Sequence, residues 1–119
     1  MKNKFKNLIL ILFCFILLLK NGSANEPFIF DVTEIEILEN GNKINGYKGG
    51  TVTSVDGSTF KAKNFFYNKA TNVLKTTGEV TYFDKIKNVI ITADKAIYFK
   101  NDEKIFTYGN SKVFSEDNT

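Results

Sequence analysis

The sequence predicts an all-β protein, and three observations support that prediction. Phe, Tyr, Ile, Val and Thr, which favour strands, are abundant, and the chain has a single proline. No sustained helical stripe of apolar residues follows residue 24. Finally, one spaced apolar set occurs three times, with a period of 30 and then 31 residues. A fixed period in this range indicates stacked units, each too small to bury its apolar face alone.

The three copies of the apolar set align residue by residue. They are Phe30, Val32, Ile35, Ile37 and Ile44; Phe60, Ala62, Phe65, Tyr67 and Leu74; and Ile91, Ala93, Ala96, Tyr98 and Ile105. Steps of two place side chains on one face of a strand. The step of three in the middle breaks that alternation, so we expect a bulge or corner there, after which the same face points inward again. The polar pairs at this step are Thr33 and Glu34, Lys63 and Asn64, and Asp94 and Lys95.

Residues 1–24 have the order of a secretory signal peptide. Three lysines precede an unbroken apolar run over residues 8–19, and the small residues Gly22 and Ala24 follow it. The run is shorter than the about 20 residues of a transmembrane helix. We therefore expect a signal-peptide helix over 1–24, cleaved after Ala24, and one domain over 25–119. The alternative is an uncleaved anchor that tethers the same domain to the inner membrane.

Removal of the signal peptide changes the charge and the cysteine content. The chain has sixteen basic residues, all lysine, and thirteen acids. Four of the lysines lie in the signal, so twelve remain against thirteen acids. The alkaline isoelectric point is thus no evidence for nucleic-acid binding, and we expect no nucleic-acid partner. Cys14, the only cysteine, leaves with the signal, so disulfides cannot stabilise the mature domain.

Each repeat unit is expected to contain two strands joined by a tight turn. The first strand holds the corner, and polar connectors follow at 38–43, 68–73 and 99–104, the first with the hairpin signal Asn40-Gly41. Second strands follow over 74–82 and 105–113, and Gly78 and Gly109 mark a kink or a close backbone approach in them. The first unit departs from this pattern, with extra glycines at 46, 49 and 50. Turns at 56–58 and 84–88 join the units. A closed barrel, a sandwich and an open rolled sheet are all compatible with this pattern.

The recurring apolar positions have two interpretations. They are a filled core, or part of the interior stays open as an apolar groove that shields an acyl chain from water. An enzyme is not expected, since the mature chain has no His, Cys or Arg and its acid pairs lie in turns or on outward strand faces. We likewise expect no metal and no cofactor.

Two segments resemble a known family. Residues 91–98, Ile-Thr-Ala-Asp-Lys-Ala-Ile-Tyr, and 74–80, Leu-Lys-Thr-Thr-Gly-Glu-Val, are similar to the recurring motif of the OstA-like domain of lipopolysaccharide-transport proteins, and the resemblance spans 28–115. It implies an open, twisted β-jellyroll of stacked two-strand units in the periplasm. It also implies that the acyl chains of lipopolysaccharide (lipid A) lie in the interior, and that the domain pairs through edge strands with other transport proteins or end to end with its own copies, to carry lipopolysaccharide to the outer membrane.

The candidate lipid groove combines the repeated positions with the second strands. Its residues are Ile35, Ile37, Ile44, Phe65, Tyr67, Leu74, Val80, Tyr82, Ala96, Tyr98, Ile105 and Val113. The competing hypothesis is a secreted structural β-roll, a scaffold or adhesin module, whose core is fully packed and binds no lipid.

Overall fold

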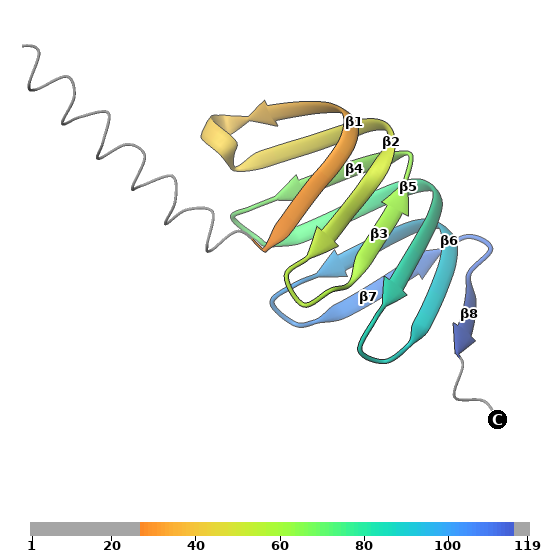
Figure 1. Ribbon diagram of the computed structural model, residues 1–119. Helices are drawn as coiled ribbons and strands as arrows, with labels where there is room; N and C mark the ends of the chain where they lie inside the picture. Colours follow the sequence, from red (N-terminus) through yellow and green to blue (C-terminus); the bar gives the residue numbers. More distant parts are fainter. Residues whose placement is uncertain (1–26, 116–119) are drawn as a thin grey trace, which may run out of the picture.

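The computed structural model describes residues 27–115, so the expected signal peptide over 1–24 lies outside the described residues. The prediction of an all-β domain is confirmed, because eight strands form one antiparallel sheet (Figure 1). The strands are β1 (Phe28–Leu38), β2 (Lys43–Ser54), β3 (Thr59–Ala62), β4 (Asn64–Asn68), β5 (Val73–Asp84), β6 (Val89–Phe99), β7 (Lys104–Tyr108) and β8 (Lys112–Ser115). A short 3₁₀ turn, η1 (Glu39–Gly41), joins β1 to β2.

The sheet folds over on itself along one line that runs across the direction of the strands. The long strands β1, β2, β5 and β6 cross this line, whereas the short pairs β3 with β4 and β7 with β8 each divide at it. We call the two halves arm A and arm B. Arm A consists of residues 35–38, 43–47, 64–68, 73–77, 95–99 and 104–108. Arm B consists of residues 28–32, 50–54, 59–62, 80–84, 89–93 and 112–115.

The corners lie where the steps of three predict them. Register shifts occur between Val32 and Glu34 and between Thr77 and Val80, and Lys63 separates β3 from β4. In β6, Asp94 stands opposite the second of these shifts, and its backbone nitrogen donates a hydrogen bond to the Gly109 oxygen (2.8 Å). The extra residue in each strand restores the inward direction of the apolar face after the corner.

The expected kinks at Gly78 and Gly109 are confirmed. Both lie in the left-handed region, with φ of +85° and +75°, which glycine adopts without steric cost. In the first unit, the corner instead depends on a close approach between the backbones of β1 and β2. A Cβ atom on Gly50 would lie 2.5 Å from the Asp31 carbonyl oxygen and 2.6 Å from the Val32 Cα. The extra glycines of this unit therefore allow β1 and β2 to turn the corner together.

The repeated positions form two rows of cross-strand neighbours, one on each arm. The arm A row is Ile37, Ile44, Tyr67, Leu74, Tyr98 and Ile105. The arm B row is Phe30, Val52, Phe60, Tyr82, Ile91 and Val113. The rows face each other across the interior, because the ring of Phe28 lies 5.0 Å from that of Tyr67, and the ring of Phe60 lies 5.4 Å from that of Tyr98.

The interior is tapered. Many of the residues beside the corner line are small, and they are Gly46, Gly50, Ala62, Ala93 and Ala96. The larger residues there have small neighbours, since Phe65 stands beside Gly46 and Val80 beside Ala93. Aromatic and branched side chains fill the wider space toward the hairpin ends. The centre of the stack is densely packed, and Phe60, Phe65, Leu74, Val52 and Val80 are almost completely buried. Stability therefore comes from apolar burial and strand pairing.

We predict that Gly50→Ala destabilises the domain by about 3 kcal/mol, since its Cβ would collide with backbone atoms that cannot move independently. Gly41→Ala is the matched control, because Gly41 also has positive φ (+92°) but has open space around its Cβ position. That control should lose only about 1 kcal/mol. Urea unfolding followed by circular dichroism measures both losses. Equal losses in the two variants would show that close approach at the corner is not the constraint.

Candidate functional site

All twelve predicted groove residues lie on the inner side of the folded sheet, since each belongs to an inner row or stands beside the corner line. They differ in exposure. Seven belong to the buried core, and they are Phe65, Tyr67, Leu74, Val80, Tyr82, Ala96 and Tyr98. Ile44 and Ile105 are partly buried against that core. The other three, Ile35, Ile37 and Val113, are 50%, 63% and 66% exposed.

The three exposed residues lie on the outermost strands. Ile35 and Ile37 belong to β1 at one end of the stack, and Val113 belongs to β8 at the other (Figure 1). Among residues 27–115, each has an inner-row neighbour on one side only, because there β1 pairs with β2 alone and β8 pairs with β6 alone. Their exposure thus comes from their place in the stack, and the apolar interior reaches both of its ends.

One part of the interior is hollow. A cavity of about 430 Å³ lies between the arms where β5, β6 and β7 approach each other. Its apolar wall consists of Tyr82 and Ile91 from arm B, Tyr98 and Ile105 from arm A, and Val89 and Ile86 near the β5–β6 turn. The volume falls within the range of small-molecule sites, about 300–1,000 Å³. The predicted residues Tyr82, Tyr98 and Ile105 are therefore brought together around an open space.

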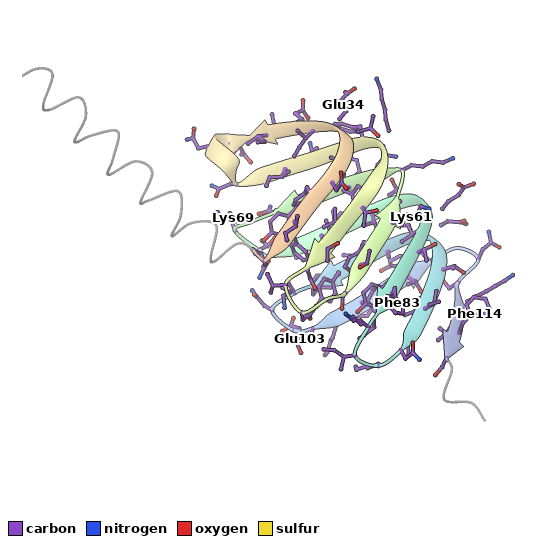
Figure 2. All side chains as sticks on the ribbon, in the orientation of Figure 1. Glu34, Lys61, Lys69, Phe83, Glu103 and Phe114 are labelled. Carbon is purple, nitrogen blue, oxygen red and sulfur yellow. The ribbon has the colours of Figure 1, made fainter. Side chains whose placement is uncertain are left out.

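The rim of this cavity is polar and mainly acidic. Asp56, Asp84 and Glu103 line it together with a single cation, Lys87. Figure 2 shows Glu103 at a hairpin end of arm A. Asp56 is held firmly, because the Ser54 hydroxyl donates a hydrogen bond to its carboxylate and the Ser58 backbone nitrogen donates another (3.1 Å). These bonds, the Ser54 bond above all, lower the pKa of Asp56, so the carboxylate stays charged.

Two phenols stand between the apolar wall and the acidic rim. The Tyr82 hydroxyl lies 3.4 Å from both the Ser58 hydroxyl and an Asp84 carboxylate oxygen. Burial raises the pKa of Tyr82, and burial followed by the charge of neighbouring groups raises the pKa of Tyr98 to about 12. The mouth of the cavity therefore carries a negative potential, which disfavours an additional anion there.

Sequence reasoning did not assign part of this site. Ile91 belongs to the third copy of the repeat but was not among the predicted groove residues, and Val89, Ile86 and the acidic rim were not anticipated. The repeat itself holds the missing signal. Ile91 occupies the position of Phe60 in the second copy, so the third layer has a smaller side chain where the second has an aromatic ring. Less side-chain volume in that layer is consistent with the cavity beside it.

The described residues contain no group of three or more His, Cys, Asp or Glu that could hold a metal ion. Within residues 27–115, no helix is both long and apolar enough to span a membrane. A scan against protein-family models found no match for the chain, and a search of curated proteins found no similar sequence.

We predict that Tyr98 makes stability depend on alkaline pH. Its folded pKa, about 12, lies above the ordinary value of about 10. The protonated phenol is therefore compatible with the fold below pH 10, and stability is lost as the pH rises toward 12. Tyr98→Phe should flatten this loss in urea unfolding measured at intervals across the window. Tyr108→Phe, at an exposed tyrosine, is the control. Identical pH profiles for the wild type and Tyr98→Phe would contradict the assignment.

Proposed function

We propose that the domain is an open, twisted β-jellyroll of the OstA-like type that binds lipopolysaccharide in the periplasm and takes part in its transport to the outer membrane. The observation that supports this proposal is the cavity between the arms. It combines an apolar wall with an opening at the hairpin ends, which suits an acyl chain that enters from the side. In this function the domain catalyses no reaction and needs no cofactor.

The rim limits how such a lipid can lie. Asp56, Asp84 and Glu103 would repel a phosphate group at the mouth, and only Lys87 would attract one. In our proposal the acyl chain therefore enters the cavity while the phosphorylated sugar stays outside the rim. The energy of binding then comes from apolar area removed from water, about 25 cal/mol per Å².

The alternative function is a structural β-roll, and the packed centre of the stack favours it. Leu74, Phe65 and Phe60 are fully buried, so the space between them has no room for a ligand in the described state. A continuous lipid path would require the arms to separate there. The two hypotheses thus differ at the cavity, which a scaffold would leave empty.

We predict that a photo-crosslinking amino acid at Ile91 labels a co-purifying glycolipid in protein from a lipopolysaccharide-bearing host. Ile91 lines the cavity. Its neighbour Ile90 is the matched control, because alternation places Ile90 on the outer side of arm B, where it is 39% exposed. Mass spectrometry of the crosslinked adducts identifies what is bound. Labelling of lipid at Ile91 but not at Ile90 supports the transport function, whereas protein-only adducts at Ile91 support the scaffold.

The ends of the stack suit edge-to-edge pairing with another copy or a related domain. β1 runs from the tip of arm B across the corner to the tip of arm A, whereas β7 and β8 together run from arm A to arm B. A second copy could therefore add its β1 antiparallel to β7 and β8, as β1 pairs with β2 within the domain. Both inner rows would then continue into the second copy, with its Ile37 beside Ile105 of the first copy and its Phe30 beside Val113.

The two ends also carry opposite charge. β1 contains Asp31, Glu34 and Glu36 and no lysine, whereas β7 and β8 contain Lys104 and Lys112 and no acid. Glu34 already pairs with Lys48 at 2.9 Å. The continued arm B register would place Asp31 directly opposite Lys112, and opposite charges in such a cross-strand position are favourable.

We predict that Asp31→Lys weakens end-to-end association several-fold, because it places two lysines opposite each other. The double variant Asp31→Lys with Lys112→Asp should recover most of the association, since it restores an opposite-charge pair. Sedimentation velocity over a range of protein concentrations measures the change, and circular dichroism checks the fold. Failure of the double variant to recover, with both proteins folded, would rule out this pairing.

A further inference from the structure

The outer side of arm A is unusually apolar and basic for an exposed sheet face. Along each strand of arm A, outward-facing residues alternate with those of the inner row, and the outward-facing residues of adjacent strands form rows of their own. The row nearest the hairpin tips is Leu38, Lys43, Asn68, Val73, Phe99 and Lys104, and the next is Glu36, Asn45, Phe66, Lys75, Ile97 and Phe106. Aromatic rings pack on this face, with Tyr47 and Phe66 centred 6.0 Å apart and Phe99 and Phe106 5.6 Å apart.

This face is hollowed. A groove of about 970 Å³ lies over β2, β4 and β5 and the ends of β1 and β6. Leu38, Phe66, Val73 and Phe99 form its apolar floor, and Lys43 and Lys75 are the charged residues that line it. None of the described residues that line it is acidic. Tyr67 of the inner row also lines the groove, but no residue lines both the groove and the interior cavity, and the four floor residues lie on the outer face of their strands.

Lys75 has no acidic neighbour in the sheet. Phe66 and Ile97 lie directly across from it on the two adjacent strands. The diagonal positions are Asn64, Asn68, Lys95 and Phe99, and the next positions along its own face are Val73 and Thr77. Among the described residues, Lys75 has no ion pair. An uncompensated cation with apolar side chains directly across from it on both adjacent strands is a favourable position for an anionic group.

The carboxylates nearest to the groove are already engaged. Glu36, at the β1 end, accepts hydrogen bonds from the Asn45 amide and the Tyr47 hydroxyl, both at 3.2 Å. Glu39 pairs with Lys43 at 3.3 Å, and both side chains are about half exposed. Because such an exposed ion pair contributes little to stability, Lys43 can leave Glu39 for another anionic group at a small cost in free energy.

The outer side of arm B provides an internal comparison. Lys61 lies there between Thr51 and Thr81, in a polar row that continues to Thr92 and Lys112. Lys61 and Lys75 are both exposed lysines at the middle of a strand. They differ in their neighbours, which are threonines for Lys61 and apolar side chains for Lys75. The combination of a groove, an apolar floor and an unpaired lysine thus distinguishes arm A.

We infer that the outer groove of arm A binds an anionic single-chain amphiphile, with the chain on the floor of Leu38, Phe66, Val73 and Phe99 and the phosphate or carboxylate head at Lys75 and Lys43. The site does not depend on the interior cavity or on the proposed transport function. Its charge is opposite to that of the interior mouth, so the two apolar sites of the domain would accept different lipids.

A tryptophan reporter tests this site directly, because the chain has no tryptophan. We predict that Val73→Trp shows a saturable blue shift of its fluorescence when dodecyl phosphate is added below its micelle concentration. Thr81→Trp, on the outer side of arm B, should not respond. Dodecyltrimethylammonium, which has the same chain but a cationic head, should produce a much weaker response in Val73→Trp.

Reversing the charge of Lys75 in the Val73→Trp protein tests the role of this lysine in binding. Lys75→Glu should weaken dodecyl phosphate binding about tenfold, in line with the loss of one charge-assisted hydrogen bond. Lys61→Glu makes the same charge change on arm B and should leave the affinity unchanged. Circular dichroism verifies that each variant is folded, and Ile91→Ala should also leave this affinity unchanged because Ile91 lines only the interior cavity.

Three results would overturn the inference. Equal weakening by Lys75→Glu and Lys61→Glu would show a general charge effect. A response to phosphatidylglycerol vesicles but not to monomeric dodecyl phosphate would show that arm A docks flat on a membrane surface and has no groove site. Loss of the response in Ile91→Ala with Lys75→Glu unchanged would place the amphiphile in the interior cavity. Because that cavity is probed separately by the Ile91 crosslinker, the two proposals can fail independently.

Discussion

The structure depends on a one-residue change of register at the line where the long strands turn and the short strand pairs divide. Side chains alternate between the two faces of a strand, so a strand that simply bent would present the same alternating set on both sides of the bend. The extra residue at each corner sets the phase of the second arm, so both arms direct their apolar row inward. The bulges, the break at Lys63 and the glycines at 50, 78 and 109 serve this single requirement.

The fold also explains why the interior is closed in one place and open in others. Two arms that diverge from a corner leave a wedge between them, and small residues fit its narrow side while rings fill its wide side. In the central layers, Phe60, Phe65 and Leu74 fill the wedge completely. Toward β7 and β8 the side chains are smaller and no further layer follows among the described residues. A cavity and an exposed apolar edge therefore arise at the same end.

Much of this arrangement could be predicted from the sequence. The 2-3-2 spacing predicts the inner rows and the corners, because strand periodicity is a local property of the chain. Exposure could not be predicted in the same way. Ile37 and Leu74 belong to the same inner row of arm A, yet Ile37 is exposed and Leu74 is buried, since Ile37 lies on β1 at the edge of the sheet. The outer groove of arm A was also missed, because it depends on which outward-facing residues of different strands become neighbours. This follows from the register of the strands and cannot be read from any single segment.

The interior cavity and the outer groove of arm A are both apolar, and their charged residues distinguish them. The interior mouth carries Asp56, Asp84 and Glu103, whereas the groove on the outer side of arm A is lined by lysines alone among charged residues. Apolar area by itself would bind similar chains at both places, because the hydrophobic effect has no direction. The charged rims supply the discrimination, since a phosphate is repelled at one and attracted at the other. A domain with this architecture would thus offer two apolar sites on opposite faces of the same sheet, of which only the outer groove of arm A would also hold an anionic head group.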